Sequence, residues 1–134
     1  MPGLRLTLTA LVTVPLAACS APVSVIAFRD CAGPSVTVKV REAEPGEVVT
    51  VKGSSFFVDC PQDARVPPTA VTDPIALHFV QKGEVHDLGS VTANPKSGKF
   101  SVEVTIPETA RPGDGRIRAE QPVRTGTRIT ITSG

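Results

Sequence analysis

The chain contains no tryptophan or tyrosine, and only 4% of its residues are aromatic. Proteins that bind single-stranded nucleic acids stack bases on aromatic side chains, so this scarcity argues against such a surface and, more weakly, against a lectin-like face. An excess of charge of one sign is also missing, since 14 Lys and Arg oppose 13 Asp and Glu. Without a basic excess there is no electrostatic basis for binding nucleic acid, which we therefore exclude as a partner.

Motifs of the common small hydrolases are absent as well. The sequence contains no Gly-x-Ser-x-Gly and no His-Glu-x-x-His pattern, and it has only two histidines, His78 and His86. Hydrolases of these classes need a nucleophile presented on a strained turn or a metal held by paired histidines. We therefore expect a protein without enzymatic activity and without a cofactor.

Long hydrophobic runs are missing except near the amino terminus. Residues 6–16 form an uncharged apolar run behind Arg5, and this run is followed by Leu16-Ala17-Ala18-Cys19. A run of about 11 residues is too short for a bilayer core of about 30 Å, which takes about 20 helical residues, so it predicts a signal peptide rather than a membrane span. The next four residues resemble the lipobox of bacterial lipoproteins.

That resemblance implies cleavage before Cys19, with residues 1–18 as the signal peptide, and attachment of acyl chains such as palmitate to Cys19. The membrane would then be a partner through the lipid anchor, and the chain would lie on the extracytoplasmic face of the cell membrane. The alternative is an ordinary secretory signal cut after Ala18, which would leave Cys19 as a free thiol.

The chain has three cysteines, and setting Cys19 aside leaves Cys31 and Cys60. In a chain exported to an oxidising compartment, such a pair predicts a disulfide. Two reduced, buried thiols are the alternative.

Alternation of apolar and polar residues dominates the rest of the chain. It predicts a lipidated N-terminus and linker over residues 19–34 and one all-β domain over residues 35–134. Seven short strands are expected, at residues 35–41, 49–53, 75–80, 85–93, 100–106, 116–120 and 127–132. Seven strands in about 100 residues favour an immunoglobulin-like antiparallel two-sheet sandwich, with a small barrel as the alternative.

Turn and core residues within this domain resemble a known pattern. Residues 45–56, which read Pro-Gly-Glu-Val-Val-Thr-Val-Lys-Gly-Ser-Ser-Phe, resemble the second-strand signature of bacterial immunoglobulin-like and IPT/TIG domains. Residues 88–91, 98–100, 106–107 and 111–113 are similar to the rest of that pattern, as in actinobacterial surface proteins. Each matched piece is a turn or core requirement, so the resemblance speaks for the fold rather than for an activity. It implies a surface or envelope module that binds, spaces or presents.

A metal site is the first candidate for chemistry. If residues 81–84 form a short hairpin turn, His78, His86 and Asp87 could lie near one another and bind Zn or Cu. The alternative is that both histidines are simply solvated or hydrogen-bonded, with His78 on the outer face of its strand, which would leave no metal site.

Two further regions are candidates for recognition. The loop over residues 59–73 contains Asp59, Asp63 and Asp73, which predicts either a polar recognition loop carrying the bridge or a calcium site of unfamiliar spacing. Basic residues gather toward the C-terminus, on the expected outer face of the last two strands, where a solvated face is the default and an acidic-polymer site the alternative. These residues are Arg116, Arg118, Arg124 and Arg128.

Taken together, the sequence predicts a non-enzymatic, membrane-anchored lipoprotein of the cell envelope that contacts protein or glycan. The alternative is an extracytoplasmic metal-binding protein that uses His78 and His86.

Overall fold

The computed structural model describes residue 10 and residues 32–134, and the predicted signal peptide, Cys19 and Cys31 lie outside this part. The described residues form ten β-strands and no helix, so none of them belongs to a helix that could cross a membrane. The predicted all-β sandwich is confirmed.

Seven of the ten strands contain four or more residues, and all seven fall in the predicted regions. They are β1 (Ser35–Val38), β3 (Val48–Ser54), β6 (Ile75–Gln81), β7 (Glu84–Val91), β8 (Phe100–Thr105), β9 (Gly113–Ala119) and β10 (Thr125–Ile131). Three shorter strands were not predicted: β2 (Glu42–Ala43), β4 (Phe57–Asp59) and β5 (Thr69–Ala70).

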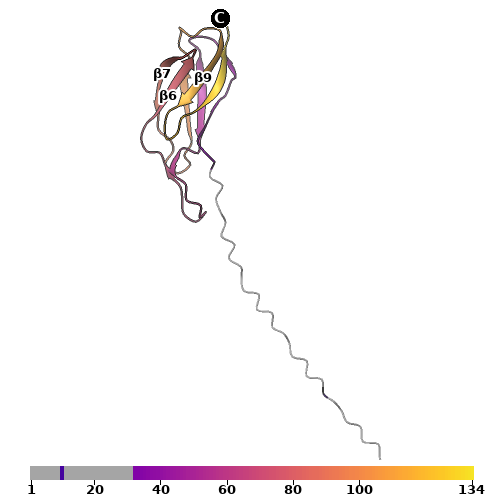
Figure 1. Ribbon diagram of the computed structural model, residues 1–134, viewed down its shortest axis with the longest axis vertical. Coiled ribbons are helices and arrows are strands. Elements are labelled where there is room, and N and C mark those ends of the chain that lie inside the picture. The colour runs from indigo at the N-terminus through magenta and orange to yellow at the C-terminus, as the bar shows by residue number, and fades with distance from the viewer. Residues whose placement is uncertain (1–9, 11–31) are drawn as a thin grey trace, which may run out of the picture.

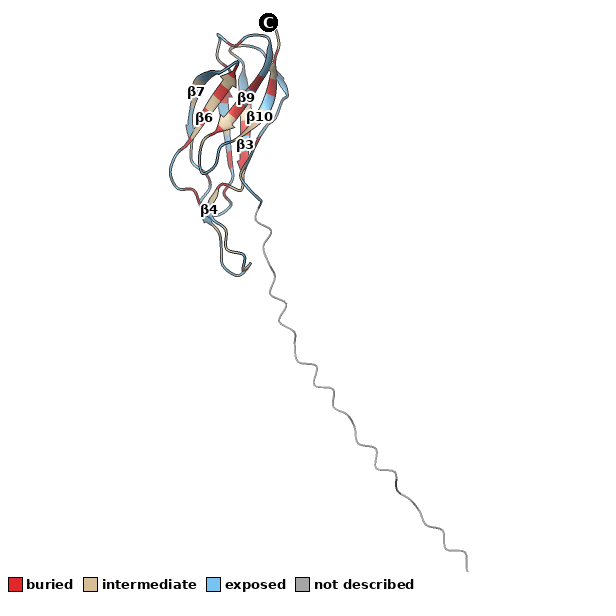
Figure 2. Cartoon of the chain, viewed as in Figure 1, coloured by how far each residue is buried: buried red, intermediate tan, exposed pale blue. Residues whose placement is uncertain are grey.

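Two sheets face each other across one core, and their strands run along the long axis of an elongated domain (Figure 1). One sheet has the order β1-β3-β8, and the other has the order β2-β10-β9-β6-β7. All pairings in them are antiparallel except that of β2 with β10. The pair β4-β5 forms a small sheet at the end of the domain opposite the C-terminus (Figure 2).

The core is built from the inward positions of alternating strands. In β6, every second residue from Ile75 to Gln81 is buried, while the residues between them are only partly covered. This is the period expected of a sheet with one face on the core. Buried aliphatic and aromatic side chains from both sheets form one cluster (Figure 2).

Each sheet contains a glycine covered by a phenylalanine ring. A Cβ atom on Gly53 would lie 2.1 Å from the ring of Phe100, and one on Gly115 would lie 2.6 Å from the ring of Phe79. Phe100 also contacts Phe56, with 4.9 Å between the ring centroids. The missing side chains therefore let large rings lie flat against both sheets.

Two expected boundaries differ from the structure. Residues 107–115 were expected to form a connection, but β9 already begins at Gly113, because residues 113–115 pair with the last three residues of β10. The expected loop over residues 59–73 contains β5, which pairs with β4. Neither pairing leaves a period-2 signal, since one segment is rich in glycine and the other is only two residues long.

Candidate functional site

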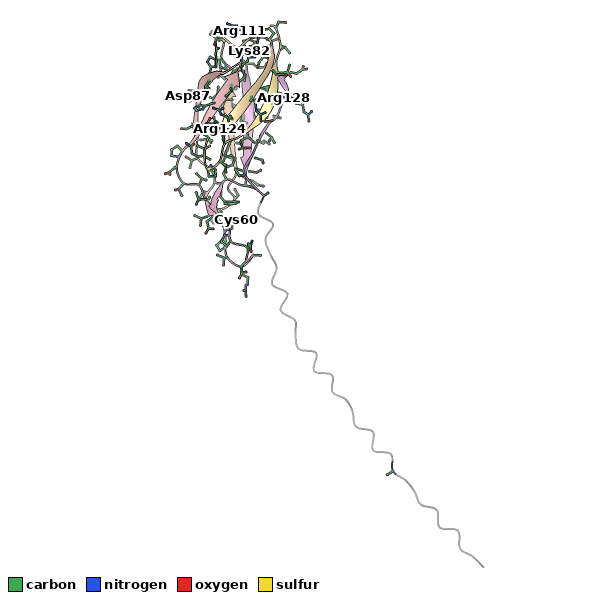
Figure 3. The ribbon with its side chains drawn as sticks, viewed as in Figure 1. Cys60, Lys82, Asp87, Arg111, Arg124 and Arg128 are labelled. Atoms are coloured by element: carbon green, nitrogen blue, oxygen red, sulfur yellow. The ribbon has the colours of Figure 1, made fainter. Side chains whose placement is uncertain are left out.

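Arginines occupy the outer face of the five-stranded sheet, at the centre of the β9-β10 ladder. Arg116 and Arg118 alternate with buried Ile117 on β9, so both face away from the core. Arg128 on β10 is directly opposite Arg116, and Gly126 is directly opposite Arg118. Arg124 lies just before β10, beside the same strands (Figure 3).

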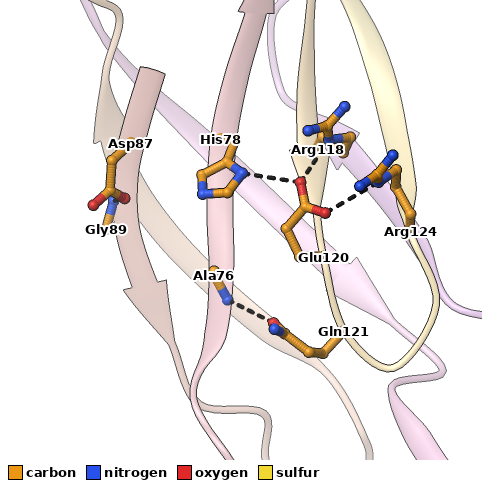
Figure 4. A network of polar contacts seen from close by, with 8 residues as sticks. All are labelled: Ala76, His78, Asp87, Gly89, Arg118, Glu120, Gln121 and Arg124. Atoms are coloured by element: carbon orange, nitrogen blue, oxygen red, sulfur yellow. Dashed lines mark hydrogen bonds and ion pairs between the residues drawn. The ribbon is translucent and has the colours of Figure 1, made fainter. Parts of the chain in front are cut away.

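One carboxylate organises part of this face. Oε1 of Glu120 accepts hydrogen bonds from Nε of Arg118 at 2.6 Å and from Nδ1 of His78 at 2.9 Å. Oε2 of Glu120 accepts a hydrogen bond from Nε of Arg124 at 3.1 Å. The network thus joins the end of β9 to β6 and to the turn before β10 (Figure 4).

Glu120 is ionised at neutral pH. Desolvation of its carboxyl group acts to raise the pKa, but the hydrogen bonds from Arg118, His78 and Arg124 outweigh it and lower the pKa from 4.5 to about 2. An ionised carboxylate can only accept hydrogen bonds, so His78 holds its proton on Nδ1.

The two arginines use only their Nε–H groups in this network. Within residues 32–134, no hydrogen bond is formed by the Nη atoms of Arg118 or Arg124. A guanidinium group has five N–H donors in a fixed plane, so four on each arginine remain for another acceptor. Glu120 therefore orients two guanidinium groups without saturating them.

The surface is hollowed where these groups meet. A hollow of about 440 Å³ lies over the junction of β6, β9 and β10, and its lining is basic. The lining residues are Val80, Arg116, Arg118, Arg124, Thr125 and Gly126. Gly126 contributes no side chain opposite Arg118, which keeps the hollow open. A second hollow of about 250 Å³ shares Val80 and Arg116 with the first and is also lined by Lys82, Arg128 and Asp114.

The outer face of the three-stranded sheet has a different character. Hydroxyl side chains predominate there, with Thr37 opposite Lys52 and Ser35 opposite Ser54. A hollow of about 610 Å³ on this side is lined by Lys52 and Lys99 together with serine and threonine side chains.

The predicted metal ligands do not converge. Asp87 is opposite His78, but His86 is opposite Phe79, whose side chain belongs to the core. Neighbours along a strand face opposite sides of the sheet, so the two histidines lie on opposite faces. The ring of His86 contacts the ring of Phe79, with 6.2 Å between the centroids. Its Nε2 atom lies 3.6 Å from Oε2 of Glu84.

The other polar groups do not complete a metal site. Oδ1 of Asp87 accepts a hydrogen bond from the backbone N–H of Gly89 at 2.8 Å. No group of three or more His, Cys, Asp or Glu side chains with metal-ligand geometry occurs among the described residues. The hairpin turn between β6 and β7 was placed correctly, but strand alternation puts His86 on the other face of the sheet from His78 and Asp87.

The predicted bridge falls partly outside the described residues. Cys60 takes part in a disulfide, and its partner lies outside them. The pairing of Cys60 with Cys31 stays a prediction, as does the lipidation of Cys19. In the loop that follows, Asp63 binds the side chain of Arg65 through an ion pair of 2.8 Å.

Comparisons with known proteins found distant structural likenesses. No family model and no curated protein matches the chain. Among solved structures, a superoxide reductase (neelaredoxin) from Ignicoccus hospitalis is 15% identical, with a TM-score of 0.44 over 75% of this chain and 80% of that one. The sporulation control protein Spo0M from Bacillus subtilis is 14% identical, with a TM-score of 0.39 over 75% of this chain and 49% of that one. Likeness at this level carries no argument about activity.

Sequence reasoning missed Glu120 as the centre of the site. Its spacing from Arg118 places both side chains on one face of a strand, which was a usable signal. Its contact with His78 spans 42 residues and depends on the pairing of β6 with β9, which no local pattern announces.

Proposed function

We propose that this protein is a lipid-anchored, non-enzymatic binding module of the cell envelope, and that it binds through the outer face of its five-stranded sheet. The observation that carries the proposal is the placement of Arg116 directly opposite Arg128 on that face. Neither arginine forms an ion pair with any of the described residues.

Like charges directly opposite each other destabilise a sheet. This pairing by itself therefore does not stabilise the sheet, and a threonine at either position would suit the strand better. A partner that carries negative charge supplies a reason for it, because its binding would relieve the repulsion. The resemblance to bacterial immunoglobulin-like surface domains supports the same class of function.

The layout of the domain suits an anchored module. Cys60 lies toward the end of the domain where the chain enters β1, while Lys82 and Arg111 lie near the opposite end (Figure 3). A lipid on Cys19 would hold the first of these ends toward the membrane, with residues 20–34 between them.

Two experiments test the two halves of this proposal. For the anchor, cells grown with an alkyne analogue of palmitate are examined for labelled protein, and the wild type is compared with Cys19→Ala. We expect label and membrane fractionation for the wild type and neither for the variant. Equal labelling of both proteins would contradict the anchor.

For the binding face, a photo-cross-linking amino acid is placed at Thr130, next to Arg128 on the arginine face. The matched control carries it at Thr50, on the outer face of the three-stranded sheet. Illumination of intact cells should yield a specific adduct from position 130 and none from position 50. An adduct from position 50 alone would place the binding surface on the three-stranded sheet and contradict the proposal.

A further inference from the structure

We infer that the hollow lined by Arg116, Arg118 and Arg124 is a binding site for a terminal phosphate group, either inorganic phosphate or the phosphomonoester of a sugar. The inference rests on the proposed function in taking the arginine face as the binding face, and it adds the chemistry of the ligand.

The charge of the site matches such a group. Three guanidinium groups and the carboxylate of Glu120 leave two positive charges at the hollow. A phosphomonoester carries about −1.5 to −2 charges near neutral pH. A single carboxylate would neutralise only half of the excess.

The number of donors points the same way. Arg118 and Arg124 each offer the N–H groups of their Nη atoms, and the side chain of Arg116 forms no hydrogen bond within the described part of the chain. A carboxylate is satisfied by one guanidinium fork, whereas a terminal phosphate presents three oxygens that several forks can share. Three arginines around one hollow therefore favour a tetrahedral anion.

The carboxylate in the network does not repel an incoming anion outright. Both oxygens of Glu120 are already engaged by Arg118, Arg124 and His78, and its side chain is only 15% exposed. Glu120 acts as a positioning residue, because it holds two guanidinium planes in place before the ligand arrives. Preorganisation of this kind lowers the entropic cost of binding.

The lining also indicates what is not recognised. No aromatic side chain lines this hollow, and Val80 is the one hydrophobic residue in its lining. Sugar rings and bases are commonly bound by stacking on aromatic side chains. The phosphate itself is therefore the recognised group, and whatever it is attached to extends into solvent.

The test is isothermal titration calorimetry on the full-length chain in detergent micelles at low ionic strength. Inorganic phosphate, glucose 6-phosphate, glucose and acetate are the probes. We expect phosphate or glucose 6-phosphate to bind with a Kd of about 1 mM or tighter. Tighter binding of the ester would identify a phosphorylated sugar as the ligand, and tighter binding of phosphate would identify the free anion.

Variants separate a built site from general electrostatic attraction. Arg116→Gln and Arg118→Gln should each weaken phosphate binding by about tenfold. Arg41→Gln removes the same charge from a separate hollow near β2 and should change the affinity by less than about twofold. Equal losses in all three variants, or acetate binding as tightly as phosphate, would overturn the inference.

Glu120→Gln distinguishes positioning from charge. This variant makes the hollow more positive, so a purely electrostatic site would bind phosphate more tightly. A site organised by Glu120 should bind it several-fold more weakly, and Arg124→Gln should then cost less in the Glu120→Gln background than in the wild type, because the two residues act together. Tighter phosphate binding by the Glu120→Gln variant would contradict the positioning role of Glu120.

Failure of this inference and failure of the proposed function can be told apart. If no probe binds while palmitate labelling of Cys19 and the adduct from position 130 are both observed, the anchored binding module stands and the phosphate site falls. If labelling and adduct are both absent while phosphate binds, the phosphate site stands and the anchored binding module falls.

Discussion

The two sheets of this domain resemble each other on their inner faces and differ on their outer faces. Inside, each sheet places a phenylalanine ring on a glycine and otherwise presents aliphatic side chains. Outside, the three-stranded sheet carries hydroxyl groups, with Thr50 opposite Glu103, while the five-stranded sheet carries Arg116 opposite Arg128. Packing constrains both inner faces in the same way, so the outer faces are where the sheets can specialise.

The largest expected effect tests the similarity of the inner faces. Gly53→Val and Gly115→Val should each destabilise the fold by about 3 kcal/mol or more, because the new side chain would overlap the ring of Phe100 or of Phe79. Unfolding in urea, followed by far-UV circular dichroism because the chain has no tryptophan, measures the loss. The control is Gly33→Val, since nothing lies within 4 Å of a Cβ atom there. A large loss at only one of the two buried sites would break the comparison.

A smaller effect is expected at the connection between the sheets. The buried side-chain amide of Gln81 donates to the backbone oxygen of Arg111 at 2.7 Å and accepts from its N–H at 2.9 Å, fastening the connection from β8 to β9. Gln81→Leu removes both hydrogen bonds and leaves the backbone groups of Arg111 without this partner. It should lower the free energy of unfolding in urea by about 1–3 kcal/mol. Gln81→Glu keeps the acceptor but places a carboxylate oxygen against the backbone oxygen of Arg111, so at neutral pH it should lose at least as much as Gln81→Leu. Equal stability of Gln81→Leu and the wild type would mean that water replaces the amide.

The acid sensitivity of the arginine face comes next. Because the pKa of Glu120 in the folded protein is lowered to about 2, its ionised form stabilises the fold above its ordinary pKa of 4.5. This contribution should be lost as the pH falls from about 5 to about 2. At pH 7, we expect Glu120→Gln to be less stable than the wild type by about 1–2 kcal/mol. This is less than the full pKa shift would give, because solvent around the exposed Arg124 screens its interaction with Glu120.

Thermal unfolding of both proteins at intervals from pH 7 to pH 2 measures that difference. The two curves should run parallel above pH 5 and approach each other below it. A constant difference down to pH 2 would show that the network, rather than the charge of Glu120, accounts for the stability.

The smallest expected effect is the loss of stability that comes from placing Arg128 opposite Arg116. Arg128→Thr removes the like charge opposite Arg116 and introduces a residue that favours strands, so stability should rise by about 0.5 kcal/mol. Differential scanning calorimetry in low salt, where screening is weak, detects the change. The matched control is Lys52→Thr on the other outer face, where the lysine is opposite hydroxyl residues, so only the smaller gain from strand preference is expected. A larger gain at Lys52 would invert the comparison between the two faces.

The strands were predictable because their cause is local. Apolar residues alternate with polar ones at Val36 and Val38 and at Phe100, Val102 and Val104. Strand geometry places the apolar side chains on one face and the polar side chains on the other, whichever strand is the partner. Strands without that alternation were missed, as with β2, whose two residues pair in parallel with the end of β10. A two-residue strand has no period to detect.

The candidate site was only partly predictable for the same reason. Arginines at alternate positions of β9 face one side by strand geometry alone, so their clustering could be expected. The metal site could have been judged from the hairpin alone, because the turn sets an unbroken register from Gln81 opposite Glu84 to His78 opposite Asp87, and strand alternation then places His86 on the other face from His78. The bulge lies beyond this segment, between Leu77 and His78, so it changes the register only of the residues farther from the turn.

By itself, the sequence determined the all-β class, the seven main strands and the side chains that fill the core, because strand period and turn chemistry are local properties. It also carries the lipobox resemblance at Cys19. The order of the strands was decided by the tertiary structure alone. Only the pairing of β6 with β9 brings His78 to Glu120, and only the register of β9 with β10 sets Arg116 against Arg128, since both depend on how distant strands share one core.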